Sequence, residues 1–524
     1  MPNHLDGHFV VKLYDAEKQR LCFFTDFIRT KTNYMTLTDD YLMITPLLLL
    51  AAVVRTPTLD LHAFNEYLWR YYILSDRTML RDVSRLQPAA LYTLHADGKL
   101  SHQRYWRWPE QYRPSSFKQT AEELVQTMKD SALLTQQLSA NPLIEFTMGQ
   151  DSRQVLAAFT HQKIPFTTAI FGKTDYMEVP NVRTMCERHG FEHHHILLNR
   201  DYTDDPWTFF KRGIILGNAE EPGYLIGRIL YMRQQYLQWT NLAINGVHGR
   251  YYKDGLWNEM YVFNLFRELK QFNVDVFLKY RALNKDYRDD IFASELIDIK
   301  SGAMDYFRQM VYQSIQGLED SPVALQVDKF DADHYANFGT VANNTSNMMI
   351  DLLSPLLFRR NMIIGVASPP QWRFQLSALQ RAVVYQLDAA LAREKTDFGG
   401  LTMQPKNFLT KGPFLMRYGF SQSKKLRDKL KNKMGFKVKT QLQKAWDYLP
   451  IYQQMFHQPE VRKRLQYDRL AMQDIIEKEP WNRMLAEYDK PENQTIDSME
   501  YLYKLLTVEY FLKQAKEIHQ KGSR

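Results

Sequence analysis

The feature that most constrains the fold of this sequence is an alternation of short β-prone runs with helical stretches between residues 143 and 197. Residues 143–147, 166–171 and 193–197 have the length and composition of strands. Helical spacing of apolar residues follows the first run, and residues 179–189 form a second helical stretch. Strands that alternate with helices in this way form parallel sheets through crossover connections. The segment therefore predicts an α/β domain with a parallel sheet.

The flanking segments predict a different organisation. Residues 8–45 contain β-branched and aromatic runs with a hairpin signal at residues 39–40, and residues 59–74 have helical patterning. Prolines and serines at residues 109–116 mark a boundary, and beyond about residue 206 the sequence is mostly helical. We expect α+β structure ahead of the α/β domain and three parts in all, at residues 1–115, 116–400 and 401–524.

Composition excludes several classes of protein. The chain of 524 residues has two cysteines, Cys22 and Cys186, so neither a disulfide framework nor a cysteine-based zinc cluster is expected. The most apolar run, residues 45–54, is half the length of a membrane span, which needs about 20 residues. No secretory signal is visible at the start. We therefore expect a buried element at this run and a cytoplasmic protein without a transmembrane segment.

Positive charge is concentrated in one segment. Residues 406–444 carry twelve basic residues and one acid, whereas the whole chain has a net charge of +8. Such a block is typical of a solvated helix face, and the alternative is a contact with an anionic partner such as a membrane surface. No nucleic-acid motif accompanies it, so no nucleic-acid partner is expected.

The turn at residues 147–152 is the most informative site signal. It contains Gly149 and joins a predicted parallel strand to a helix, where main-chain N–H groups and the helix dipole bind phosphate. Thr147 and Ser152 can donate hydroxyls to the same oxygens, Arg153 adds positive charge, and Asp151 can hold Mg²⁺. The same residue types also form ordinary turns and helix caps, so both interpretations stay open.

Two other clusters of polar residues have simpler explanations. The histidine run at residues 193–195 lies in a predicted strand, where adjacent side chains point to opposite faces, so it is not expected to bind a metal. The acidic pairs Glu220-Glu221 and Asp289-Asp290 are interpreted as solvated surface residues.

The order of several motifs resembles that of the asparagine synthetase family. The turn Thr-Met-Gly-Gln-Asp-Ser at residues 147–152 stands where the family has its pyrophosphate loop, S-G-G-x-D-S. Residues 164–172 look like the next strand, which lines the adenine pocket, and residues 178–190 look like the helix after it. Upstream, residues 76–80 and 85–88 resemble the family's linker, and residues 6–15 are similar to the middle of its glutaminase domain.

The sequence also departs from the family at positions that matter for chemistry. Residue 2 is proline rather than the nucleophilic cysteine of the glutaminase, and the early strands of that domain are absent. Met148 adds bulk to the pyrophosphate loop. In the segment that aligns with the second loop, residues 245–250, Val247 stands at a glutamate and Arg250 at a metal-binding aspartate. The catalytic lysine has no clear match, and Lys406 and Lys411 are the candidates.

The resemblance implies a shortened, β-rich domain like that of N-terminal-nucleophile hydrolases, an adenine-nucleotide α-hydrolase-like (PP-loop) synthetase domain, and a helical basic region. It implies an ATP-dependent, AMP-forming ligase that adenylates a carboxylate for attack by ammonia or an amine. ATP and Mg²⁺ are the implied cofactors. The implied catalytic residues are Arg250 and Lys411, Asp151 is the metal ligand, and the nucleotide-binding residues are Thr147, Gly149, Asp151, Ser152, Arg153, Phe171, Asn245 and Gly246.

The implied substrate is a small molecule or a peptide with a carboxylate, such as those of bacterial surface-polysaccharide or natural-product pathways. Without a glutaminase, the amine comes from free ammonia, an amine substrate or a separate subunit. A homodimer or partner chain that completes the N-terminal sheet is the expected assembly. The alternative function is that of a catalytically degenerate synthetase-like protein that serves in binding or as a scaffold, because Met148, Val247 and Arg250 replace functional residues.

Overall fold

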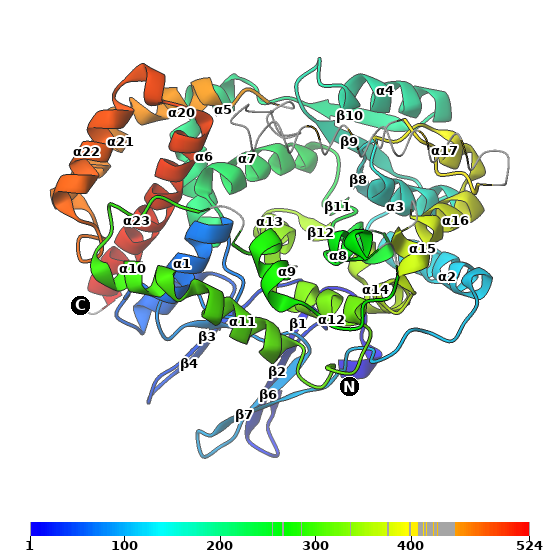
Figure 1. Cartoon of the computed structure of the whole chain (residues 1–524), viewed down its shortest axis with the longest axis horizontal. Helices are drawn as coiled ribbons and strands as arrows, with labels where there is room; N and C mark the ends of the chain where they lie inside the picture. Colours follow the sequence, from blue (N-terminus) through cyan, green and yellow to red (C-terminus); the bar gives the residue numbers. More distant parts are fainter. Residues whose placement is uncertain are drawn as a thin grey trace.

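The structure is a computed structural model, and it describes residues 2–253, 255–264, 267–283, 286–335, 337–374, 377–397, 400–406, 412, 416, 423, 427 and 446–522. It is a mixed α/β structure with one parallel sheet and two antiparallel sheets. Figure 1 shows the parallel sheet among helices in the upper half of the view, with the antiparallel strands below. Within the described residues, no helix has both the length and the apolar character that crossing a bilayer requires.

Five parallel strands form the central sheet, in the order β10 (Glu192–Ile196), β9 (Thr167–Phe171), β8 (Leu143–Glu145), β11 (Leu242–Ile244) and β12 (Asp351–Leu353). Each neighbouring pair is parallel. The parallel sheet expected from residues 143–197 is therefore confirmed. The sequence did not predict β11 and β12, because each has three residues and little periodicity can be read from so short a run.

Alternate residues of these strands enter two different cores. Leu143, Ala169 and Ala243 belong to one core, and their neighbours belong to the other. Helices that cover the second core are α2 (Phe117–Gln136), α3 (Gln150–His161), α4 (Glu178–His189), α14 (Arg359–Val366) and α16 (Ala378–Leu387). The first core is covered by α1 (Leu61–Arg70), α6 (Pro206–Leu216), α7 (Gly223–Gln234), α20 (Leu449–Phe456) and α23 (Ile496–Gly522). The sheet is thus sandwiched between two helical layers, which lie to its left and right in Figure 1.

The N-terminal region consists of two small antiparallel sheets. One has the order β1 (Val10–Asp15), β2 (Arg20–Thr25), β6 (Ala90–Leu94) and β7 (Leu100–Arg104), and the other has β4 (Leu42–Thr45), β3 (Tyr34–Leu37) and β5 (Ser84–Arg85). The hairpin expected at residues 39–40 is the β3–β4 pair. A small buried cluster of the N-terminal region consists of Phe23 of β2, Ala90 and Tyr92 of β6, and Leu86 between β5 and β6. Relatedness to a glutaminase domain remains a prediction.

The apolar run at residues 45–54 is only partly buried. It forms η2 (Leu48–Val53), in which Leu48 and Ala52 are buried but Leu50 and Val53 are 44% and 45% exposed. The turns of η2 pack against α23, so this N-terminal element is in contact with the last helix of the chain.

The C-terminal helices are part of the main body rather than an appended tail. Besides α20 and α23 they are α21 (Pro459–Arg464) and α22 (Lys478–Tyr488). Trp481, Tyr503 and Phe511 from these helices share a core with α1, α6 and α7. Most of the basic segment, residues 406–444, lies outside the described residues, so its predicted role is not addressed by the structure.

A helical insertion separates β11 from β12. It contains η4 (Gly249–Tyr252), α8 (Asn258–Phe263), α9 (Val274–Arg281), α10 (Ser294–Ser301), α11 (Ala303–Ser314), α12 (Val323–Phe330), the π-helical turn η5 (Asp331–Tyr335) and α13 (Asn337–Ser346). Residues of α9, α11 and α12 form a third core. Further short elements are η1 (Pro2–His4), α5 (Arg200–Asp204), η3 (Gln235–Gln238), η6 (Pro355–Leu357), α15 (Pro370–Phe374), α17 (Ala389–Arg393), η7 (Tyr467–Arg469) and η8 (Pro491–Asn493).

Candidate functional site

The order of the parallel strands reverses between β8 and β11, and the region beyond the carboxyl ends of these two strands is called the crevice. The chain runs outward from β8 to β9 and β10, and then returns to β11 and β12 on the other side of β8. Sheets of this kind bind ligands beyond the carboxyl ends of the strands at such a reversal. The first loop (residues 147–152) follows β8, and the second loop (residues 245–250) follows β11. The two loops that the sequence singled out therefore lie together at this point.

Two side-chain hydroxyl groups of the first loop form hydrogen bonds within the loop itself. The main-chain N–H of Gly149 donates to Thr147 Oγ1 at 3.0 Å, and the N–H of Thr147 donates to Ser152 Oγ at 3.2 Å. The two hydroxyl oxygens lie 3.1 Å apart. Gly149 is the N-cap of α3, so the helix begins within the loop. In this conformation Thr147 and Ser152 shape the loop, and a phosphate would have to exchange with these contacts.

Two glycines of the second loop lie against the first loop. A Cβ atom at Gly246 would be 2.7 Å from the main-chain carbon of Asp151 and from the N atom of Ser152. A Cβ atom at Gly249 would be 2.1 Å from the carboxylate carbon of Asp151. Neither position therefore has space for a side chain without movement of its neighbour. The sequence predicts that Gly246 binds the nucleotide. In the structure, the absence of a side chain at Gly246 allows the two loops to be in close contact.

The carboxylate of Asp151, the predicted metal ligand, is bonded at both oxygens. Lys253 Nζ lies 2.8 Å from Oδ2, and Gln380 Nε2 donates to Oδ1 at 2.9 Å. Among the described residues, no cluster of three or more acidic, histidine or cysteine side chains is placed to hold a metal ion. Mg²⁺ needs near-octahedral oxygen ligands at 2.0–2.1 Å. The residues present therefore do not fit a Mg²⁺ ion on Asp151 in this arrangement.

Arg250 lies in a second charged cluster beside the loops. It pairs with Asp331 of η5 at 3.1 Å and lies 2.9 Å from His248 Nδ1. Burial raises the pKa of Asp331 to about 6, and the neighbouring Arg250 opposes that rise. Arg373 donates to the main-chain oxygen of Arg250 at 3.3 Å and forms a completely buried pair with Asp328. Arg250 thus supplies a positive charge at the site, held in place by buried acids.

Arg153 does not face the crevice. Its guanidinium is buried and donates to the main-chain oxygens of Glu394 at 2.7 Å and Lys395 at 2.8 Å. Burial lowers its pKa to about 10. In the structure Arg153 therefore forms hydrogen bonds that connect α3 to the segment after α17, in place of the predicted contact with phosphate.

The other predicted nucleotide-binding residues differ in their surroundings. Asn245 is buried, and its amide bonds to Asn343 at 3.0 Å and accepts from Ser354 at 2.5 Å. Phe171 ends β9 and is half-buried against the core that contains α6 and α7. Lys411, the predicted catalytic lysine, lies outside the described residues. Lys406 is described, and its ammonium donates to Thr402 at 3.2 Å.

Sequence reasoning missed three residues of this site: Lys253, Gln380 and Asp331. Lys253 follows the second loop by three positions, and the sequence analysis did not extend the second loop that far. Gln380 is 229 residues from the carboxylate to which it donates, and Asp331 is 81 residues from Arg250. No local signal in the sequence could have found the last two.

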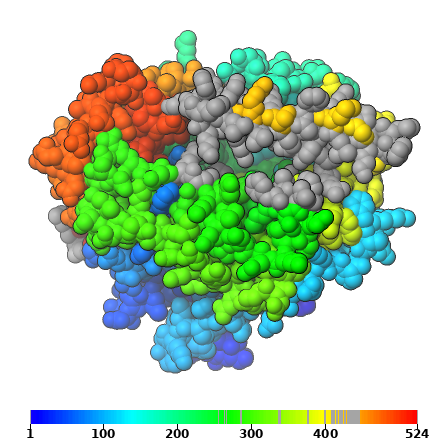
Figure 2. All heavy atoms as spheres, in the orientation of Figure 1, coloured from blue at the N-terminus to red at the C-terminus, as the bar shows by residue number. Residues whose placement is uncertain are grey.

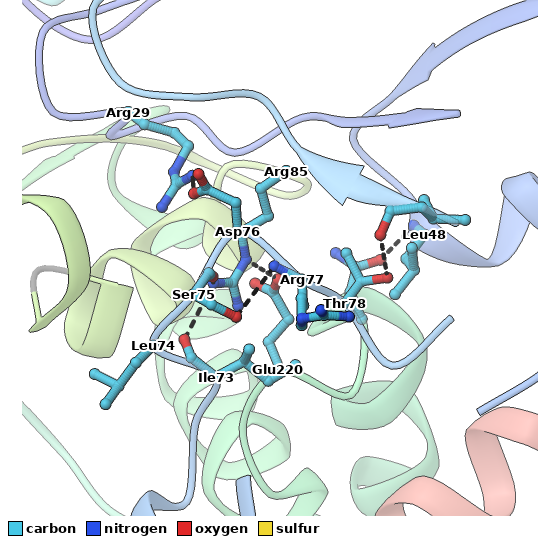
Figure 3. Close-up of polar contacts among 12 residues, drawn as sticks. Arg29, Leu48, Ile73, Leu74, Ser75, Asp76, Arg77, Thr78, Arg85 and Glu220 are labelled. Carbon is cyan, nitrogen blue, oxygen red and sulfur yellow. Dashed lines mark hydrogen bonds and ion pairs between the residues drawn. The ribbon is translucent and has the colours of Figure 1, made fainter. Parts of the chain in front are cut away.

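The acidic pair Glu220-Glu221 was interpreted as surface, and that interpretation is wrong. The two residues are 1% and 2% exposed. Glu220 pairs with the buried Arg85 of β5 at 2.5 Å, which links the turn between α6 and α7 to the N-terminal strands (Figure 3). Burial raises the pKa of Glu221 to about 8. Consecutive acids usually stay solvated, and here a partner 135 residues away overrides that rule for Glu220.

The histidines at residues 193–195, which are not expected to bind a metal, each have their own contacts. His193 Nδ1 lies 2.9 Å from Thr168 Oγ1, and His195 Nε2 lies 2.7 Å from the main-chain oxygen of Gly172. His194 stacks on Trp239, with ring centroids 3.9 Å apart. The three side chains therefore have separate structural partners.

Figure 2 shows a hollow near the centre of the face that looks toward the viewer, with faint blue-green atoms at its floor. A separate groove of about 810 Å³ lies between the N-terminal strands and α11, and its lining includes Asp60, Asp76, Arg77, Tyr306 and Gln313. Figure 3 shows Asp76 of this groove paired with Arg29. This groove shares none of its lining residues with the two loops.

Comparison with known proteins leaves the family of this chain open. No family model matches the chain. No curated protein matches its sequence. Among solved structures, it is similar to the NMN synthetase of Francisella tularensis, with 17% identity over 43% of this chain and 96% of that chain and a TM-score of 0.23. So distant a likeness establishes neither the family nor the function of this chain.

Proposed function

We propose that this chain binds the polyphosphate of ATP at the meeting of the two loops and is an AMP-forming ligase. One observation carries the proposal: the first and second loops follow adjacent parallel strands at the reversal of strand order. The N-terminus of α3 adds partial positive charge there, and Lys253 and Arg250 add two formal charges. Both cations are partly exposed, with side-chain exposures of 29% and 24%.

The chemistry proposed is carboxylate activation. An oxygen of the substrate carboxylate bonds to the α-phosphorus of ATP as the bond to the pyrophosphate oxygen breaks, which gives an acyl-adenylate and pyrophosphate. Ammonia or an amine then bonds to the acyl carbon, loses a proton, and AMP departs. The contribution of this chain is to position the reactants and to stabilise the charge that develops on pyrophosphate. Arg250 and Lys253 are the residues proposed for that stabilisation, and no step is assigned to Mg²⁺.

Calorimetric titration with ATP tests the proposal, followed by exchange of labelled pyrophosphate into ATP in the presence of carboxylates. We expect ATP to bind with micromolar affinity and inorganic pyrophosphate to compete with it. The affinity for ATP should fall about tenfold or more in the variant Arg250→Gln. The matched control is Arg288→Gln, because Arg288 is also a partly exposed arginine in ion pairs, with Asp290 and Glu487, but lies outside both loops. Absence of ATP binding with and without Mg²⁺ would overturn the proposal.

A second candidate function is nucleotide or anion binding without catalysis. The observation that favours it is the occupation of both Asp151 oxygens by Lys253 and Gln380, which removes the expected metal ligand. The two candidates differ in one result. A ligase exchanges pyrophosphate with ATP when its carboxylate is present, whereas a binding protein holds ATP and leaves it intact with every carboxylate tried.

A further inference from the structure

The carboxylate of Asp151 connects three segments that are far apart in the sequence. It lies in the first turn of α3, accepts from Lys253 after η4, and accepts from Gln380 in α16. Gln380 is fully buried, and its amide oxygen has no donor among the described residues. Among the described residues, Asp151 alone orients the side-chain amide of Gln380. Asp151 acts as the centre of a clasp formed by Asp151, Lys253 and Gln380.

Close packing by the second loop reduces the space for a hydrated metal ion at the clasp. The main chain at Gly249 approaches the Asp151 carboxylate so closely that an added Cβ would lie 2.1 Å from Oδ1 and 2.6 Å from Oδ2. Mg²⁺ usually keeps several of its water ligands in proteins. A Mg²⁺ ion on this carboxylate would have to displace Lys253 or the second loop together with its own water.

The ammonium of Lys253 is already where a cation would neutralise Asp151. It lies 2.8 Å from Oδ2, on a side chain that is 29% exposed. A lysine is a compact charge on a flexible stem, so the ammonium can contact a phosphate oxygen while it stays near Asp151. Arg250 of the second loop adds a second cation, which is held by Asp331. Together with the N-terminus of α3, these two side chains supply the positive charge that a polyphosphate without a divalent ion requires.

We infer that this site takes its polyphosphate without a divalent cation, and that Lys253 supplies the charge that Mg²⁺ would otherwise supply. The inference rests on the polyphosphate site of the proposed function and specifies its ligand, the metal-free anion. Asp151 is then a positioning residue for Lys253, and its negative charge opposes ligand binding. A metal ligand would have the opposite effect, which makes the two roles separable by experiment.

The test is calorimetric titration of the full chain with inorganic pyrophosphate and with ATP, each in EDTA and in excess Mg²⁺. In EDTA we expect both to bind, with the affinity for pyrophosphate lowered about tenfold or more in Lys253→Met and largely retained in Lys253→Arg. The control Lys300→Met also loses a lysine paired with aspartates, at a position outside the two loops, and should bind like the unmodified chain. Thermal unfolding of each variant establishes that it is folded.

The variant Asp151→Asn gives the sharper result. It keeps a group that can accept from Gln380 but removes the negative charge, so metal-free pyrophosphate should bind about tenfold more tightly. If Asp151 is a metal ligand, the same variant abolishes a binding that depends on Mg²⁺. The effect of Asp151→Asn therefore tests the inference even if the Lys253→Met variant does not fold.

The outcomes separate the inference from the proposed function. Pyrophosphate binding in EDTA that depends on Lys253 supports the inference. If pyrophosphate binds in this way but ATP does not bind, the proposed function is overturned and the inference is retained. Binding of ATP and pyrophosphate only in Mg²⁺ overturns the inference and leaves the proposed function intact. Absence of binding under every condition overturns both.

Discussion

The two loops at the crevice have the same place relative to their strands but are stabilised in different ways. In the first loop, Thr147, Gly149 and Ser152 bond to one another over at most five positions. In the second loop, Asn245 bonds to residues 98 and 109 positions away, and Arg250 pairs with a residue 81 positions away. The part of the first loop from Thr147 to Gly149 is therefore shaped by local hydroxyl contacts, although its Asp151 has partners far along the chain. The second loop keeps its shape only while the surrounding fold is intact.

The largest expected effect comes from removing the buried support of the second loop. Arg373→Met leaves Asp328 without its partner in a completely buried position and removes the donor to the main-chain oxygen of Arg250. Loss of one member of a buried pair costs about 3–5 kcal/mol. Urea unfolding should report a decrease of that size. The control Arg308→Met breaks an exposed pair and should change stability by less than about 1 kcal/mol. Equal effects of the two variants would contradict the long-range support of the second loop.

The next effect comes from forcing the loops apart. Gly246→Ala places a methyl group 2.7 Å from main-chain atoms of Asp151 and Ser152, which cannot rotate away. Overpacking of this kind costs about 1–3 kcal/mol, and we expect the upper part of that range in urea unfolding. In Gly302→Ala the nearest atoms lie 3.8 Å from the added carbon, so stability should stay within about 0.5 kcal/mol. A Gly246→Ala protein as stable as this control would mean that the loops are not in close contact.

A pH titration tests the electrostatic support of the second loop. Burial raises the pKa of Asp331 to about 6 in the folded protein, whereas the unfolded value is about 3.9. Between these two values the folded state binds more protons than the unfolded state. The contribution of Asp331 to stability is therefore fully present below about pH 4 and declines as the pH rises to about 6, by on the order of 2 kcal/mol.

The measurement is the free energy of unfolding from pH 4 to 7 for the unmodified protein and for Asp331→Asn. We expect the difference between the two proteins to change over this range, because the variant cannot titrate at that position. A constant difference would show that Asp331 is ionised throughout this range. The ion pair with Arg250 would then lower the pKa of Asp331 by more than burial raises it.

The smallest effect tests the local character of the first loop. Thr147→Val removes the hydroxyl that accepts from Gly149 and contacts Ser152, with little change in volume. Loss of one such hydrogen bond costs about 1 kcal/mol. Thr147→Ser keeps the hydroxyl and should restore most of that stability. If the two variants unfold alike, the hydroxyl does not hold the loop.

The parallel sheet illustrates how far the sequence could be read. Strands β8, β9 and β10 were predicted within two residues at each end, and helix α4 within one residue, because each segment has a clear period and a turn at its end. The helix after β8 was predicted without bounds. Strands β11 and β12 were not, since each has three residues and β12 follows a helical insertion. The first loop was predicted as a candidate site because a glycine-containing turn between strand and helix is a local pattern, and its function stays a prediction.

Pairing was what the sequence could not indicate. Glu220 has the composition of a surface residue and is buried against Arg85, and Arg153 has the charge of a phosphate ligand and braces main-chain carbonyls instead. In both cases a partner more than a hundred positions away decides the role of the side chain.

The sequence by itself determined the class of the fold, the strands β8, β9 and β10 of the parallel sheet and the position of the first loop, because hydrophobic periodicity and turn chemistry act over a few residues. Only the tertiary structure decided that the second loop meets the first and that Lys253 and Gln380 occupy the carboxylate expected to hold a metal. Charges and close main-chain contacts act through space, and the segments that carry them are brought together only when the chain has folded.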